Sequence, residues 1–195
     1  MFSEFIFCDD AKLNEIEENI WIARNIRHAM EIGELFLVYQ PIVDINTRTI
    51  LGAEASAERG IISPLKFITI AEDIGFINEL GYQIIKTAMG EFRHFSQRAS
   101  LKDDFLLHIN VSPWQLNEPH FHERFTTIMK ENGLKANSLC VEITETVIER
   151  INEHFYLNIE QLRKQGVRVS IDEMFINSNL KRFYEINPDS IKVDS

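Results

Sequence analysis

The chain has 195 residues, of which 45% are hydrophobic, and it carries a formal net charge of −10. This composition supports the packed core of a single domain and excludes a disordered chain. The excess of acidic residues argues against nucleic acid as a partner, because its phosphates would be repelled, but it is compatible with a phosphate ligand held through metal ions.

Neither targeting signals nor disulfides are indicated. No apolar run approaches the length of a membrane span, and residues 1–10 lack the basic start of a signal peptide. Cys8 and Cys140 lie far apart, do not have the spacing of a metal site, and are interpreted as reduced thiols. We therefore expect a cytoplasmic protein that does not insert into a membrane.

The first elements predict an unusual start to the sheet. Residues 1–10 are short and apolar and are expected to form a strand or a docking arm. Apolar residues at helical spacing predict a helix over 11–31, which ends at Gly33. Strands over 35–43 and 50–54 are joined by a turn over 44–49. A parallel crossover needs about a dozen residues or more, so these two strands must be antiparallel neighbours.

The rest of the chain alternates helices with strands. Ser63 and Pro64 begin one helix as its N-cap and first residue, and a second helix covers about 78–95. Strands over 106–111 and 139–145 precede helices over 121–131 and 152–165. The last part is expected to contain a strand over 167–171, a loop over 172–179, a short helix through residue 186 and a strand over 190–193. This alternation predicts a parallel sheet covered by helices.

Five of these strands have one apolar face and one small or polar face. The strand over 139–145 carries a carboxylate in its middle, which is costly to bury unless a partner compensates it. One such residue alone would be typical of a solvated edge strand, but four other strands share the pattern. If the sheet curls into a barrel, sites lie at the carboxyl ends of its strands. The residues expected to ring that mouth are Glu54, Asn110, Glu142, Asp172 and Lys192.

Several of these residues also have a structural interpretation. Asn110 could satisfy backbone groups inside the barrel, and Lys192 taken alone is typical of a solvated strand end. His108 shares the polar face with Asn110, and we interpret it as a hydrogen-bonded core histidine and not as a metal ligand.

Six stretches of the sequence resemble the EAL family, the bacterial cyclic di-GMP phosphodiesterases. They are Y-Q-P-I-V-D at 39–44, G-A-E-A at 52–55, I-N-V-S at 109–112, V-E-I-T-E-T-V at 141–147, G-V-R-V-S-I-D at 166–172 and I-K-V-D at 191–194. Each motif alone is weak, but six in the same order and spacing are specific. The resemblance divides the chain into an arm with the start of the leading helix, 1–15, and a partial EAL domain, 16–195.

The resemblance implies an α/β fold, a TIM-like EAL barrel with an antiparallel first strand pair, incomplete at about six strands. It also implies two Mg²⁺ or Mn²⁺ ions that activate a water for attack on a phosphodiester. The residues that match its metal ligands are Glu54, Asn110, Glu142, Asp172 and Glu173. Lys192 matches the lysine that orients this water or stabilises charge, and with Glu54 it is the expected catalytic residue. Glu145 matches a glutamate that anchors a loop and does not bind metal.

Three departures from the family pattern weaken the expected activity. The R-W-x-H-P segment is missing before E-R-G-I-I-S-P, and with it an arginine that contacts a substrate phosphate; an alignment without a gap puts Glu58 there. The loop after Asp172 has Glu173 in place of a second aspartate and has lost both glycines. The chain stops after the sixth strand, without the family's seventh and eighth strands, a further catalytic glutamate and a substrate-binding glutamine.

These departures favour a degenerate, truncated EAL domain in cyclic di-GMP signalling. It would act through a protein partner, a homodimer or weak nucleotide binding, with little or no hydrolysis and at most one weak metal site. One alternative is a Mg²⁺- or Mn²⁺-dependent phosphodiesterase that gives linear pGpG; another is a dimerisation module that binds no nucleotide. Open strand edges are expected to make the chain associate unless residues 2–8 cover the gap.

Overall fold

The computed structural model describes residues 10–60, 62–99, 101–102, 104–144, 151–172 and 185–193. In chain order the elements are α1 (Asp10–Glu31), β1 (Phe36–Val43), β2 (Ile50–Glu58), α2 (Pro64–Asp73), α3 (Ile77–Arg98), β3 (Leu106–Asn110), α4 (Pro113–Leu116), α5 (Phe121–Glu131), the 3₁₀ helix η1 (Ala136–Ser138), β4 (Leu139–Thr144), α6 (Glu153–Gln165), β5 (Arg168–Asp172) and β6 (Ser190–Ile191). No helix among these residues is both long enough and apolar enough to cross a bilayer.

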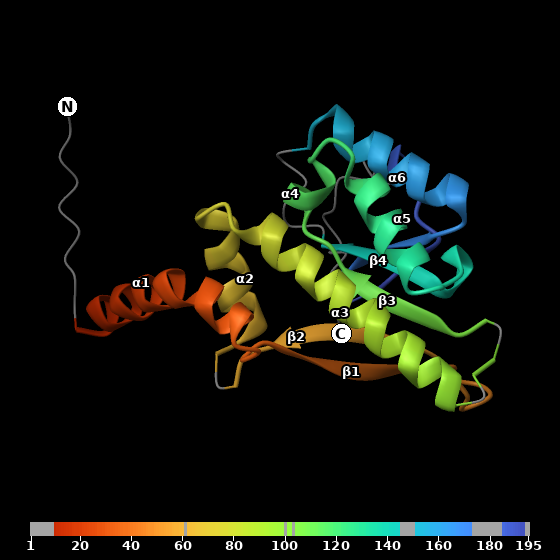
Figure 1. Cartoon of the computed structure of the whole chain (residues 1–195), viewed down its shortest axis with the longest axis horizontal. Coiled ribbons are helices and arrows are strands. Elements are labelled where there is room, and N and C mark those ends of the chain that lie inside the picture. Colours follow the sequence, from red (N-terminus) through yellow and green to blue (C-terminus); the bar gives the residue numbers. More distant parts are fainter. Residues whose placement is uncertain are drawn as a thin grey trace.

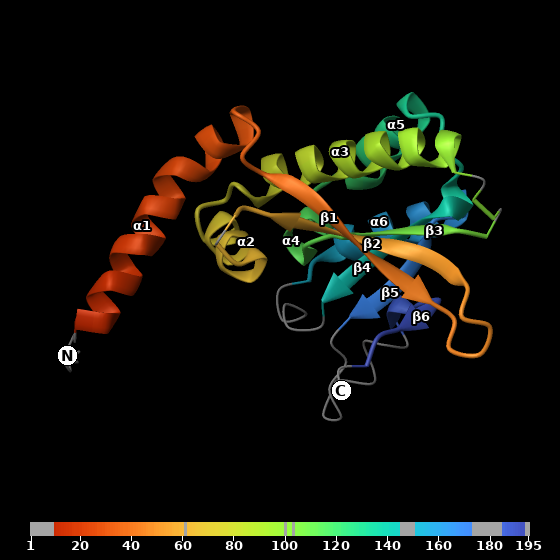
Figure 2. The ribbon, with the colours of Figure 1, turned by 90° about the horizontal axis from the view of Figure 1, so that it is seen from below.

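The strands form one curved sheet in the order β1-β2-β3-β4-β5-β6 (Figures 1 and 2). β1 and β2 are antiparallel, with Gln40 opposite Glu54 and an irregularity between Ile42 and Val43. Every later pair is parallel. The α/β class and the antiparallel first pair expected from the six-residue turn are therefore confirmed.

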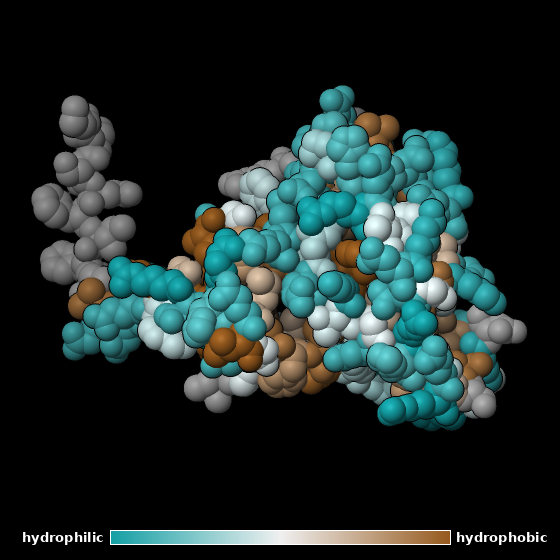
Figure 3. Space-filling view, in the orientation of Figure 1, coloured by the Kyte–Doolittle hydropathy of each residue, from teal (hydrophilic) through white to brown (hydrophobic). Residues whose placement is uncertain are grey.

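The core lies between the outer face of the sheet and the helices. Leu107, Val141 and Val169, one from each of three neighbouring strands, are completely buried, as are Phe125 of α5 and Phe155 of α6. Burying each such side chain contributes about 1.5–3 kcal/mol. These apolar strand residues therefore point outward to the helices, and the polar residues that follow them in sequence, His108, Glu142 and Ser170, point to the inside of the curved sheet. The side of the helical layer seen in Figure 3 is mostly hydrophilic.

A second apolar cluster joins α1 to α2. Ile22 and Ile26 of α1 pack with Phe67 and Ala71 of α2, all at most 1% exposed. The first half of α1 extends away from the rest of the described chain (Figures 1 and 2), and its large apolar side chains, Leu13, Ile16 and Ile20, are 42–48% exposed. The predicted boundary at residue 15 lies within this helix, so the division of the chain stays a prediction.

The ends of two helices follow the expected sequence signals. Ser63 caps α2 by accepting a hydrogen bond from Lys66 N, with Pro64 as the first residue of the helix. Asn152 caps α6, which ends at Gly166 with a φ of 98°, a backbone conformation that favours glycine.

Four parts of the chain differ from the predicted elements. α4 and η1 were not predicted, β2 continues to Glu58 where 50–54 was expected, and the last strand covers only Ser190–Ile191 where 190–193 was expected. α4 begins at a capping box, in which Ser112 and Gln115 bond to each other's backbone N–H groups, and this local pairing stabilises a helix of only four residues.

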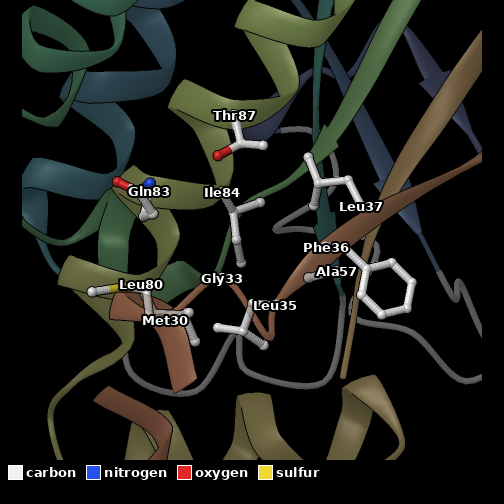
Figure 4. A pocket seen from close by; sticks show the side chains of 10 residues that line it. All are labelled: Met30, Gly33, Leu35, Phe36, Leu37, Ala57, Leu80, Gln83, Ile84 and Thr87. Atoms are coloured by element: carbon white, nitrogen blue, oxygen red, sulfur yellow. The ribbon is translucent and has the colours of Figure 1, made fainter. Parts of the chain in front are cut away.

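A cavity of about 200 Å³ lies between the end of α1, β1 and α3 (Figure 4). Its lining is mainly apolar and includes Met30, Leu35, Leu80 and Ile84. None of the predicted site residues lines it.

Candidate metal centre

The inner face of the curved sheet brings three acidic residues together, one each from β2, β4 and β5. One carboxylate oxygen from each of Glu54, Glu142 and Asp172 lies within 4.8 Å of the other two. In the sheet register Glu54 is level with His108, two residues before Asn110, and Asn110 is level with Glu142. Glu142 is in turn level with Ser170, two residues before Asp172, so the three acidic residues are staggered by two residues each across regularly paired strands.

Lys192, two positions after β6 begins, reaches back across the sheet to these carboxylates. Its Nζ lies 2.5 Å from Glu54 Oε2 and 2.6 Å from Glu142 Oε2. Asn110 Nδ2 donates a hydrogen bond of 2.8 Å to the other oxygen of Glu54. The two Oε2 atoms therefore share one cationic group, and Asn110 fixes the orientation of Glu54.

Burial and hydrogen bonds act in opposite directions on the charged groups of the centre. Burial raises the pKa of Glu54, but the hydrogen bonds from Lys192 and Asn110 outweigh it, and the net pKa is lowered. Burial likewise lowers the pKa of Lys192, but its bonds to Glu142 and Glu54 outweigh this, and the net pKa is raised. Glu54 is thus held as a carboxylate and Lys192 as an ammonium group near neutral pH.

His108 is buried beside this cluster. Its Nδ1 lies 2.6 Å from Glu142 Oε1, its side chain is 10% exposed, and Glu142 is completely buried. The sequence favoured a hydrogen-bonded core histidine, and His108 is one. What the sequence did not reveal is that its partner is a predicted metal ligand.

Gln40 lies beside Glu54 in the sheet and was not among the predicted site residues. It lies opposite Glu54 on β1, and directly opposed residues of an antiparallel pair project from the same face. The signal was present in the Y-Q-P-I-V-D stretch, where Gln40 is a polar residue between Val38 and Ile42 on one face of the strand.

Two of the predicted site residues, Glu145 and Glu173, lie outside the described residues. Their roles as loop anchor and metal ligand stay predictions.

The phosphate-contacting arginine was expected to be missing from the connection between β2 and α2. Arg59 lies in this connection, and its partners are outside the centre. Arg59 is only 6% exposed. Its Nη2 lies 3.2 Å from Glu34 Oε2, and its guanidinium lies over the ring of Trp21 at 5.1 Å. Arg59 thus ties this connection to α1 and to the start of β1.

The side chains of the centre fit a hard divalent cation. Three carboxylates supply oxygen ligands and negative charge, and Asn110 carries an amide oxygen of the same hard type. Mg²⁺ and Mn²⁺ prefer oxygen ligands of this kind, whereas zinc and copper sites favour imidazole and sulfur.

Comparison with known proteins gives a consistent result. A model of the EAL domain family matches residues 23–195. The chain is 94% identical, over 201 aligned positions, to the "Probable cyclic di-GMP phosphodiesterase PdeI" of Escherichia coli strain K12. That alignment covers all of this chain and 26% of the relative, so the chain spans about a quarter of the length of this curated relative.

Two solved structures share the fold. The EAL enzyme Bd1971, in a form with cAMP and cyclic di-GMP bound, is 26% identical with a TM-score of 0.81, covering 92% of this chain and 51% of the other. The EAL domain of DcpA from Mycobacterium smegmatis is 31% identical with a TM-score of 0.64, covering 82% of this chain and 64% of the other.

Proposed function

Because this chain belongs to the EAL domain family, we propose that it acts in bacterial cyclic di-GMP signalling through the cluster at its strand ends. The observation that carries the proposal is the convergence of Glu54, Glu142 and Asp172 within 4.8 Å, with Lys192 in contact with the first two. The 94% identical relative, a probable cyclic di-GMP phosphodiesterase, and the EAL enzyme structure with cyclic di-GMP bound support the choice of ligand.

Glu54, Glu142 and Asp172 would hold Mg²⁺ or Mn²⁺, with Asn110 as a further ligand. A divalent cation at this place would polarise the phosphodiester and make a water more acidic. Asn110 keeps Glu54 oriented through its 2.8 Å hydrogen bond. Lys192 brings a positive charge next to the carboxylates, where it can stabilise negative charge on the phosphoryl oxygens.

The reaction this arrangement serves is attack of water on one phosphodiester of cyclic di-GMP. One P–O bond breaks, and the product is the linear dinucleotide pGpG. For this chain we propose that the reaction is slow and that the role is regulatory. A guanidinium fork is a preferred grip for phosphate, but Arg59, which follows β2, is occupied by Glu34 and Trp21. Loss of one such contact typically costs about 10²–10³ in rate.

The alignment with the E. coli relative supports a shortened chain. It runs over 201 positions, whereas this chain has 195 residues, so the relative has residues at places where this chain has none. The 94% identity, in turn, favours the second candidate function, an efficient cyclic di-GMP phosphodiesterase.

A regulatory role needs a partner. The proposed partner is a protein or a second copy of this chain that pairs with the β6 edge, since Ile191 and Val193 are 40% and 79% exposed.

The test measures binding and turnover separately. The purified chain is incubated with cyclic di-GMP and Mn²⁺, binding is followed by calorimetry, and pGpG by chromatography. Glu54→Ala removes a proposed ligand, and Glu58→Ala is the matched control, because it removes a carboxylate from the same strand and the same face four residues further on.

We expect Mn²⁺-dependent nucleotide binding that is lost in Glu54→Ala and kept in Glu58→Ala, with turnover far below the rate of about 1 s⁻¹ or more that is usual for an enzyme. Turnover in that usual range would instead establish the efficient phosphodiesterase. Absence of nucleotide binding would leave only the dimerisation module and contradict the proposal.

A further inference from the structure

The two oxygens of the Glu142 carboxylate have different partners, because His108 contacts one and Lys192 contacts the other. Glu142 Oε1 lies 2.6 Å from His108 Nδ1, and Oε2 lies 2.6 Å from Lys192 Nζ. A carboxylate oxygen only accepts, so Nδ1 must carry the proton and donate it to Oε1. The ammonium group of Lys192 also contacts Glu54 Oε2. Oε2 of Glu142 is therefore the oxygen that already faces a shared cation.

The strand register and the burial of His108 and Glu142 account for this arrangement of partners. His108 is level with Cys140 in the β3–β4 register, two residues before Glu142, so the two side chains are diagonal neighbours on the inner face. Glu142 has no exposed surface, and His108 as a whole residue is buried as well. A buried carboxylate oxygen without a donor would be costly, and so would a buried ring N–H without an acceptor. The hydrogen bond prevents both.

We infer that His108 is a positioning residue for Glu142: its Nδ1–H holds Oε1 and thereby presents Oε2 toward Glu54 and Asp172, where a divalent cation would bind. This inference rests on the proposed metal centre and deepens it. Metal-ligating groups are commonly held by outer hydrogen bonds of this kind, and loss of one typically weakens metal binding about 10–100-fold.

The competing interpretation is that His108 only fills space in the interior of the sheet. Under that interpretation any substitution that keeps the packing should leave metal affinity unchanged. Two substitutions separate the interpretations. His108→Leu keeps apolar bulk and removes the donor. His108→Asn is smaller but keeps a donor, because its Nδ2 is bonded to Cγ as the ring Nδ1 is.

Ser170→Ala is the matched control. Ser170 is 1% exposed, lies on the same inner face and is level with Glu142 in the β4–β5 register. Its hydroxyl donates to the carbonyl of Ser190 and not to Glu142. This variant therefore perturbs the same interior without touching the hydrogen bond in question.

The measurement is the Mn²⁺ dissociation constant of each full-length variant by calorimetry, together with the rise in melting temperature that saturating Mn²⁺ produces. We expect His108→Leu to bind Mn²⁺ about 10–100-fold more weakly. We expect His108→Asn to recover most of that loss, and Ser170→Ala to bind as the unaltered chain does even if its metal-free melting temperature falls.

Three other outcomes would overturn the inference. If His108→Leu binds Mn²⁺ as tightly as the unaltered chain, His108 does not position Glu142, and the proposed metal centre still stands. If Ser170→Ala loses as much affinity as His108→Leu, the effect is general loosening of the interior. If the unaltered chain binds no Mn²⁺, the metal centre fails as well, because there is no ligand for His108 to position.

Discussion

Substituting the same residue type at Gly52 and at Gly90 should change stability in opposite directions. A Cβ on Gly52 would lie 2.4 Å from the carbonyl oxygen of Leu106 on β3. Non-bonded atoms in ordinary van der Waals contact are about 3.5 Å apart. β2 and β3 would therefore have to separate by about 1 Å where Gly52 is paired with Leu106. Overpacking of this kind costs about 1–3 kcal/mol.

Gly90 offers the matched case, because it lies inside α3 and the same added atom would meet nothing closer than Asn132 Oδ1 at 3.6 Å. Replacing a glycine by alanine inside a helix stabilises it by about 0.5–1 kcal/mol. Gly90→Ala should therefore be more stable than the unaltered chain, and Gly52→Ala less stable.

Urea unfolding followed by circular dichroism measures both changes. With a slope of about 1–3 kcal/mol per molar urea, the two midpoints should differ by roughly 0.5 M or more. Glu54 is two residues after Gly52 on the same face, so Gly52→Ala should also weaken Mn²⁺ binding, whereas Gly90→Ala should not. A Gly52→Ala variant as stable as Gly90→Ala would refute the close approach of the two strands.

Three further predictions concern stability and association. Asn152→Ala removes the cap of α6 and should lower the free energy of unfolding by about 1 kcal/mol; an unchanged urea midpoint would show that the cap is dispensable. Glu34→Ala leaves the buried guanidinium of Arg59 without its carboxylate and should lower the melting temperature more than Glu15→Ala, whose ion pair is exposed; equal losses would contradict this. Light scattering should show concentration-dependent association that Ile191→Lys reduces, and a monomer at high concentration would exclude pairing at the β6 edge.

The arrangement of the strands was largely predictable from sequence because it depends on local features. A six-residue turn admits only an antiparallel pair, and the alternation around Glu142 separates an inner from an outer face over one strand length. Once each polar face was assigned, the parallel order of the strands was enough to bring Glu54 and Asp172 to the same end of the sheet.

What the sequence could not supply are contacts that depend on register or on several elements together. His108 and Glu142 meet diagonally, and a shift of β3 by one residue would turn His108 to the other face. Arg59 is held by one residue from α1 and one from the segment before β1, which no local pattern relates to it. The short helix α4 did have a local signal in the sequence, the capping-box spacing of Ser112 and Gln115 directly after the strand predicted over 106–111.

The ion pair between Lys192 and Glu54 joins residues that are 138 positions apart in the chain. The paired strands all join segments that are nearer in the chain, so this contact closes the longest loop among the predicted site residues. Closing a loop carries an entropic cost that grows with the length of the loop. We expect the pair to form late in folding, after the intervening strands have assembled. An interaction absent from the folding transition state slows unfolding and leaves the folding rate nearly unchanged. A cation bound at this centre would therefore lengthen the lifetime of the folded chain without making it fold faster.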